Sequence, residues 1–293
     1  MDVRKPQSSD EQEKEIAEAG EAHDRSAPGG MIVYKAILLE GEEELARSSA
    51  ALFWSGIAAG LSMGLSMIAE ALLQTHLPDA EWRPLVSKLG YSAGFLVVIL
   101  GRQQLFTENT LTPILPLLAR RPKATPSNVL RLWAIVLVGN LLGGLVLALV
   151  AAHTSAFDPD VQSTFMEMGE KALDNGVVTV LVRGVFAGWM IALMVWLLPF
   201  AETGRVGVII IVTYLVGLGE FSHVIAGSIE VFTLCAIGEA SWLDVIGTYV
   251  LPTLIGNIVG GVTLVAMLNH AQVTAGGDNE SVSRDAPAGA RTS

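Results

Sequence analysis

The hydrophobic pattern of the chain forms six apolar segments separated by polar stretches. They cover residues 50–73, 91–118, 132–152, 177–201, 206–237 and 250–268. A helix needs about 20 predominantly apolar residues to cross a bilayer, and each segment meets or approaches that length. The pattern therefore predicts an all-α, polytopic membrane protein with six transmembrane helices.

Polar residues interrupt the second and fifth segments. Gly101, Arg102 and two glutamines break the second, and the sequence from Gly219 to His223 breaks the fifth. A broken helix inside a membrane is tolerated only where its backbone is buried in protein or lines a water-filled cavity. Ionisable residues at such depth mark substrate or proton paths. We therefore expect a transport pathway with His223 at its centre.

The two halves of the chain resemble each other. The motif Gly-Asn-x-x-Gly-Gly occurs at 139–144 and again at 256–261. The separation of Gly101 and Gly219 along the chain is similar to the separation of these two copies. A third match relates residues 55–60 to 183–188. Because each half holds three segments, the second enters the membrane from the opposite side. Broken helices in inverted repeats, here 50–152 and 177–268, indicate a substrate site near the midplane.

The repeated small and amide residues have a structural interpretation as well. Small residues one turn apart let helices approach closely, so we expect the repeated glycines to pack helices together. Asn140 and Asn257 are interpreted as interhelical hydrogen-bond donors rather than ligands. Cys235, the single cysteine, excludes a disulfide within the chain and is expected to be a small buried hydrophobe.

The ends of the chain are polar. Residues 1–30 are predicted to form a disordered acidic tail, residues 31–49 an amphipathic helix with Ile32, Ala36, Leu39 and Leu45 among its apolar positions, and 269–293 a disordered tail. The first 50 residues carry twelve Asp or Glu against six Lys or Arg, which excludes a nucleic-acid-binding role. Arg120, Arg121, Lys123, Arg131 and Arg205 lie in two loops on one side. By the positive-inside rule both termini should be cytoplasmic.

Three stretches give the chain a family resemblance. Residues 105–111 (Leu-Phe-Thr-Glu-Asn-Thr-Leu), residues 223–226 (His-Val-Ile-Ala) and the twin Gly-Asn-x-x-Gly-Gly segments resemble the formate/nitrite transporter family over about residues 35–270. The resemblance implies an aquaporin-like fold in a bacterial inner membrane and a homopentamer with one anion pore per protomer. It implies that Thr107 and His223 form a central hydrogen-bonded pair. It also places Tyr91, Phe95, Leu105, Val195 and Val216 at the apolar constrictions.

The chain departs from the family pattern in ways that indicate a divergent inner-membrane branch. Family channels follow the pore histidine with Ser-Ile-Ala-Asn, whereas Gly227 stands at the Asn position here, and Ala192 replaces an Asn of the fourth segment. A charged set is present instead: Arg102, Glu108, Arg183 and Glu220. We expect Arg102 and Glu220 to occupy equivalent places in the two breaks. Either they pair with each other, or Arg102 attracts the anion while Glu220 takes part in proton transfer. Arg183 either recruits anions or snorkels to the interface, and Glu108 is expected to cap a half-helix.

The predicted function is a channel or transporter for small monovalent anions. A carboxylate crosses an apolar constriction far more easily as its neutral acid, and a histidine titrates near neutral pH, so His223 is a candidate for proton transfer. The alternatives are an aquaporin-like channel for neutral solutes and a membrane scaffold without transport. No His-Glu-x-x-His or Gly-x-Ser-x-Gly motif occurs, so neither an enzyme nor a metal or other cofactor is expected.

Overall fold

The computed structural model describes residues 30–122 and 124–275, and these residues are helical with no strand. The predicted all-α fold is confirmed. The predicted disorder of residues 1–29 and 276–293 falls outside the described residues. The helices of the first half are α2 (Gly30–Ala46), α3 (Ser49–His76), α4 (Arg83–Ser87), α5 (Ser92–Leu100), α6 (Ile114–Leu118) and α7 (Pro126–His153), with the short helices η1 (Lys88–Tyr91) and η2 (Glu108–Thr110).

The second half repeats this order after an additional helix. Its elements are α8 (Pro159–Leu173), α9 (Val177–Leu197), η3 (Leu198–Phe200), η4 (Glu202–Gly204), α10 (Arg205–Leu218), α11 (Ala226–Ile237), α12 (Trp242–Val245), η5 (Ile246–Val250), α13 (Leu251–Gly261) and η6 (Val262–Met267). The helix that contains α12, α13 and η6 continues to Ala275. The predicted start of the disordered tail at residue 269 is therefore wrong.

Five described stretches are long and apolar enough to cross a membrane. They are Ser49–His76, Arg83–Leu100, Pro126–His153, Val177–Phe200 and Trp242–Ala275. The predicted fifth crossing is divided between α10, with 14 residues, and α11, with 12, so neither spans a bilayer alone. The count of six membrane crossings stays a prediction, because it counts α10 and α11 together as one crossing.

Glycines hold the equivalent helix pairs of the two halves in close contact. A Cβ added to Gly60 of α3 would lie 2.1 Å from the carbonyl oxygen of Asn140 in α7. In the second half, a Cβ on Gly188 of α9 would lie 2.2 Å from the carbonyl oxygen of Asn257 in α13. Only glycine permits backbones to approach this closely. The expectation that the repeated glycines pack helices is confirmed.

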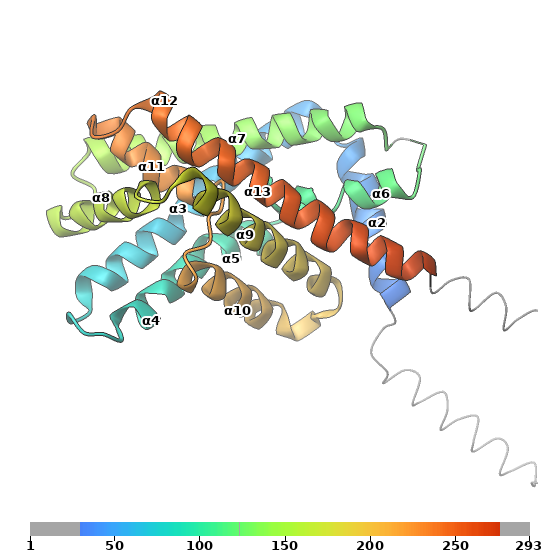
Figure 1. Ribbon diagram of the computed structural model, residues 1–293, viewed down its shortest axis with the longest axis horizontal. Helices are drawn as coiled ribbons and strands as arrows, with labels where there is room; N and C mark the ends of the chain where they lie inside the picture. Colours follow the sequence, from blue (N-terminus) through green and yellow to red (C-terminus); the bar gives the residue numbers. More distant parts are fainter. Residues whose placement is uncertain (1–29, 123, 276–293) are drawn as a thin grey trace, which may run out of the picture.

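Both ends of the described chain lie at the same end of the bundle (Figure 1). The Tyr34 hydroxyl of α2 is 2.7 Å from Nδ1 of His270, which lies near the end of the last helix. The basic loop is here too, because Arg121 pairs with Glu42 of α2 at 3.0 Å. Helices α8, α11 and α12 lie at the opposite end (Figure 1). We call these the α2 end and the α8 end.

Helix α2 buries Leu45 as predicted, but the rest of its buried face differs from the predicted one. Its buried residues are Tyr34, Ile37, Leu38, Gly41 and Leu45, whereas Ile32 and Leu39 are exposed. The reason is its packing against α6: a Cβ on Gly41 would lie 2.0 Å from the carbonyl oxygen of Thr112, just before that helix. The helix is thus fixed to the bundle by Gly41 and its neighbours rather than by the predicted stripe.

Candidate functional site

The two helix breaks have the same backbone geometry. Helices α5 and α10 end at Leu100 and Leu218, and in each case a glycine follows and then a residue with positive φ. The amide of the next residue reaches back into the helix: Gln103 N–H donates to Val98 at 3.0 Å, and Phe221 N–H donates to Val216 at 3.0 Å. Such bonds satisfy carbonyls that a helix end would leave without partners. The chain then turns inward in both halves.

One asparagine supports each break. The Asn140 amide donates to the carbonyls of Gly56 and Gln104, both at 2.8 Å, and its oxygen accepts from Phe106 N–H at 2.9 Å. Asn257 repeats this pattern with Gly184 at 2.8 Å, Ser222 at 2.9 Å and Val224 N–H at 2.9 Å. The interpretation of both asparagines as interhelical donors is confirmed. They satisfy backbone groups that would otherwise be unpaired at this depth.

Thr107 and His223 meet between the two breaks. Thr107 Oγ1 and His223 Nε2 are 2.8 Å apart, and the two residues are 0% and 1% exposed. Nδ1 of His223 accepts from the backbone N–H groups of Ile225 at 3.3 Å and Ala226 at 3.2 Å. An acceptor Nδ1 means that the single hydrogen of the neutral ring is on Nε2. His223 therefore donates to Thr107.

This arrangement leaves the hydroxyl hydrogen of Thr107 available. Its oxygen accepts from His223, and no acceptor for its own hydrogen is found among residues 30–122 and 124–275. The hydroxyl of Thr110 bonds instead to the backbone carbonyl of Thr107 at 2.7 Å. The pair can thus offer one more hydrogen bond to a small acceptor.

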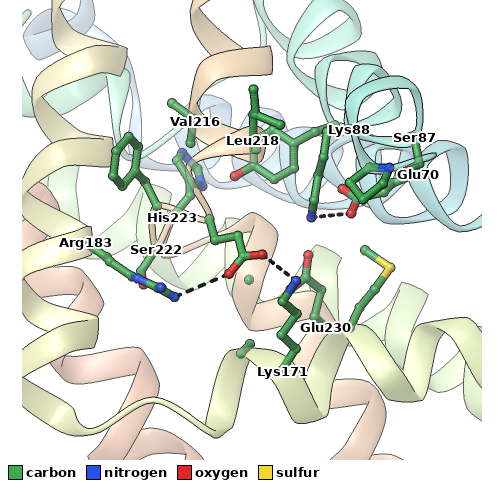
Figure 2. Close-up of a pocket in the computed structure, with 18 of the residues that line it drawn as sticks. Glu70, Ser87, Lys88, Lys171, Arg183, Val216, Leu218, Ser222, His223 and Glu230 are labelled. Atoms are coloured by element: carbon green, nitrogen blue, oxygen red, sulfur yellow. Dashed lines mark ion pairs between the residues drawn. The ribbon is translucent and has the colours of Figure 1, made fainter. Parts of the chain in front are cut away.

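A cavity of about 320 Å³ reaches His223 from the α8 end. Its inner wall contains Tyr91, Val216, Ser222, His223 and Tyr249. Charged side chains surround the space outside this wall, as Figure 2 shows: Glu70, Lys88, Lys171, Arg183, Glu220 and Glu230. The cavity is therefore a vestibule lined by charged side chains, with aromatic residues and Val216 beside His223.

Ion pairs connect most of these vestibule charges. Lys88 pairs with Glu70, which is buried in α3, and Lys171 of α8 pairs with Glu220. Arg183 of α9 approaches the same Glu220 carboxylate at 3.7 Å. Figure 2 shows these contacts as dashed lines. Arg183 is thus at the α8-end vestibule, where either recruitment of anions or a structural ion pair with Glu220 is compatible with its position.

A second cavity, of about 560 Å³, opens at the α2 end. Glu40, Glu44, Arg102, Glu108 and Val195 are among its lining residues. Arg102 Nη1 pairs with Glu40 of α2 at 2.8 Å. Glu44 accepts from the hydroxyl of Thr112 and from the Gln104 side chain. Burial raises the pKa of the Glu44 carboxyl to about 7, although the Thr112 hydrogen bond acts in the opposite direction.

Arg102 and Glu220 do not pair with each other. They occupy equivalent positions in the two breaks, as predicted, but inversion of the repeat puts them in opposite cavities with Glu40 and Lys171 as partners. The direct ion pair considered from the sequence is therefore wrong. Glu108 begins η2 and lines the α2-end cavity. No hydrogen bond from its carboxylate to a helix end is found in the described chain.

The predicted constriction residues lie around the central pair. Phe95 is 0% exposed, and its ring meets His223 edge-on with centroids 5.0 Å apart. Tyr91 packs on Phe95 at 5.4 Å and, with Val216, borders the α8-end cavity, while Val195 borders the other. Leu105, two residues before Thr107, is fully buried. Their action as constrictions stays a prediction.

The packing around position 227 explains why this residue is a glycine. A Cβ at this position would lie 1.7 Å from the Tyr249 hydroxyl oxygen. Tyr249 of η5 therefore occupies the space that a larger residue after His223 would need, and its side chain lines the cavity. An asparagine at position 227 would require the Tyr249 side chain to move.

Sequence reasoning missed most of the vestibule. It assigned no role to Glu70, Lys88, Lys171 or Glu230. One signal was present: Glu70 is the single carboxylate of segment 50–73 and Glu230 that of the apolar run after the second break, and a carboxylate is expensive inside a membrane. Among residues 30–122 and 124–275, no group of three or more His, Cys, Asp or Glu side chains is arranged to hold a metal ion.

Comparisons with known proteins agree with this geometry. Residues 31–271 match the family model of the formate/nitrite transporters. The chain is 39% identical over 250 residues to the inner membrane protein YfdC of Escherichia coli, covering 85% of this chain and 81% of that protein. A pentameric formate channel with formate bound has a similar fold, with a TM-score of 0.68 at 22% identity over 77% of this chain and 98% of that one. An FNT family ion channel gives 0.71 at 18% identity over 84% and 99%.

Proposed function

The chain belongs to the formate/nitrite transporter family, and from this premise we propose that it is a channel for small monovalent anions that cross it as their conjugate acids. The observation that carries the proposal is the buried hydrogen bond between Thr107 and His223, because His223 also lines the α8-end cavity. This pair has one hydrogen left to donate. An anion that reaches it can accept that hydrogen from the Thr107 hydroxyl.

The apolar surroundings of the pair support passage in a neutral form. Moving an ionised carboxylate into an apolar medium costs tens of kcal/mol in the idealised limit, and its neutral acid costs far less. Phe95, Tyr91 and Leu105 supply such a medium here. We therefore propose that the anion loses its charge before or when it reaches His223. The sequence also makes His223 a candidate for proton transfer.

Charged residues fit a role in delivering anions to the two cavities. Arg183 lines the α8-end cavity and Arg102 the α2-end cavity. Positive charge in a cleft raises the local concentration of anions. Glu220 and Glu40 balance these cations when no anion is present. We propose that an incoming anion competes with these carboxylates.

We further propose that the protein is a homopentamer in a bacterial inner membrane, with both termini cytoplasmic. Large apolar side chains on its outside support contacts with lipid or with neighbouring protomers: Trp54, Leu130 and Ile211 are 67%, 61% and 62% exposed. The gathering of Arg121 and Arg131 at the α2 end, beside both chain ends, supports the orientation.

Flux measurements in proteoliposomes test the proposal. We expect uptake of at least one of formate, nitrite, acetate, lactate and hydrosulfide, rising as the pH falls. His223→Ala and Thr107→Val should reduce uptake at least tenfold, whereas Thr107→Ser should retain it because the hydroxyl is kept. The oligomer of each variant is checked by size. No uptake by a correctly assembled wild type would contradict the proposal and favour a scaffold, and pH-independent uptake of only neutral solutes would favour an aquaporin-like channel.

A further inference from the structure

Among the described residues, Glu230 is a carboxylate on a buried helix of the vestibule that has no partner. It lies on α11, within the apolar part of the chain, and lines the same cavity as His223. The nearby cations already have other partners: Lys88 pairs with Glu70, and Lys171 pairs with Glu220. In the described chain, the Glu230 carboxylate has no ion pair and no hydrogen bond. Figure 2 shows it between Lys88 and Lys171.

His223 is poorly placed to give a proton to a substrate. Its hydrogen is on Nε2, and Nδ1 faces the N–H groups of Ile225 and Ala226. A second ring hydrogen, on Nδ1, would point at these two N–H donors and be repelled by them. Loss of the hydrogen on Nε2 would leave a negatively charged imidazolate. The ring can therefore donate a hydrogen bond, but the proton that neutralises an anion needs another source in the cavity.

The charges of the vestibule balance when Glu230 is ionised. Its inner charges are three cations (Lys88, Lys171 and Arg183) and three carboxylates (Glu70, Glu220 and Glu230). The remaining charged lining residues, Arg83 and exposed Glu167, have opposite charges, and the one ion pair between described residues that involves Arg83 is with Asp79 at 3.1 Å. A monovalent anion entering this space would leave one uncompensated negative charge, which is unfavourable where solvent is limited. A proton on Glu230 restores neutrality.

We propose that Glu230 is the proton-binding site of the pathway, which takes up one proton when an anion enters the vestibule and then passes it to that anion. The inference rests on the proposed anion channel and names the group that couples proton and anion. Linkage makes the effect reciprocal: the anion favours protonation of Glu230, and protonation favours anion binding by the same factor.

The proton transfer conserves charge and atoms. The O–H bond of protonated Glu230 breaks, a new O–H bond forms on an oxygen of the bound anion, and Glu230 becomes a carboxylate again. The neutral acid moves on toward Thr107 and His223. Water in the vestibule then returns a proton to Glu230 when the next anion enters.

Groups on several elements face the cavity beside Glu230 and set its charge environment. Helix α7 packs on α11 through Gly144 against Ile229 and contributes no charged side chain to the cavity lining. The titratable and charged residues around Glu230 come from α3, η1, α8, α9, the second break and η5: Glu70, Lys88, Tyr91, Glu167, Lys171, Arg183, Glu220, His223 and Tyr249. Of these, only Glu230 is an inner carboxylate without a cation partner.

Proton uptake by the purified protein tests the inference. Sodium formate and sodium lactate, each adjusted to the starting pH, are added to weakly buffered wild-type oligomer while a pH indicator records proton uptake. We expect up to one proton per protomer with the anion that the channel transports. Glu230→Gln should abolish this uptake and lower flux in proteoliposomes at least tenfold. Glu239→Gln, a change to an exposed carboxylate just beyond α11, should change neither.

The outcomes separate this inference from the proposed channel. Absence of flux in assembled wild type overturns the channel. Wild-type flux without proton uptake, or normal uptake and flux in Glu230→Gln, overturns the role of Glu230 and leaves the channel intact. If Glu230→Gln does not assemble, Glu230→Asp keeps the carboxyl and should preserve uptake. Infrared difference spectra of the wild type should then gain a protonated-carboxyl band on anion addition, and its absence would overturn the inference.

Discussion

Arg102 and Glu220 adopt the same left-handed backbone conformation, with φ of 53° and 52°. Each lies two residues beyond the end of a half-helix, and each carries a charge into a different cavity. A left-handed conformation costs a residue with a side chain about 1–2 kcal/mol. Glycine would avoid this strain, so both positions hold a charged side chain at the expense of local stability.

Substitution at these positions should separate backbone strain from charge. We expect Arg102→Gly to be more stable than Arg102→Ala by about 1 kcal/mol, because both lose the charge but only glycine relieves the strain. The same order should hold for Glu220→Gly and Glu220→Ala. Thermal unfolding of the detergent-solubilised oligomer measures the difference. Equal melting temperatures within each pair would contradict the strain.

The close helix contacts predict a sharp response to one added methyl group. Gly60→Ala and Gly188→Ala would each bring a Cβ within about 2 Å of a backbone carbonyl oxygen, so the helices must separate, and we expect a loss of about 2 kcal/mol or more. Gly207, in α10, has no atom within 4 Å of an added Cβ. Gly207→Ala should therefore be neutral or stabilising by up to about 1 kcal/mol. Melting temperatures that do not differ between these variants would contradict the packing.

The sequence contained enough to predict the centre of the site. The broken apolar segments and the repeated Gly-Asn-x-x-Gly-Gly motif determine where the backbone turns inward, and Asn140 and Asn257 act as expected. The Thr107–His223 contact followed from the family resemblance rather than from spacing. The contact joins residues that are 116 positions apart in the sequence. A local sequence pattern cannot predict a contact between residues so far apart.

The vestibule was harder to predict because its members come from separate elements. Helix α8 was not predicted, although Val161, Phe165 and Met168 follow helical spacing and are buried. Without this helix, Lys171 had no place near Glu220. The end of the last helix was missed for a similar reason: the partner of His270 is Tyr34, at the other end of the described chain. Contacts of this kind depend on the tertiary fold.

The asparagine supports should be essential to stability. Asn140→Ala or Asn257→Ala removes the partner of two backbone groups in the break and one hydrogen bond to a carbonyl of a neighbouring helix, and each buried unsatisfied group costs about 1–3 kcal/mol. We expect a loss of several kcal/mol, visible as a lower melting temperature and dissociated oligomer. Asn269→Ala is the matched control, since its amide bonds only to Val265 in its own helix. A similar loss in all three variants would refute the specific role of the two asparagines.

Docking of α2 should weaken as the pH rises. The folded-state pKa of Glu44 is raised from 4.5 to about 7 by burial. A carboxyl with a raised pKa contributes stability that is present below pH 4.5 and is lost as the pH rises through about 7. We expect protection of the α2 amides from hydrogen exchange, corrected for intrinsic rates, to fall roughly tenfold over that interval, allowing for solvent around the partly buried group.

Glu44→Gln should remove this pH dependence, because a neutral amide can still accept from Thr112 but does not titrate. Glu43→Gln serves as the control, since Glu43 is an exposed carboxylate on the same helix. It should retain the wild-type slope. If Glu44→Gln keeps the full dependence, another group controls the docking of α2.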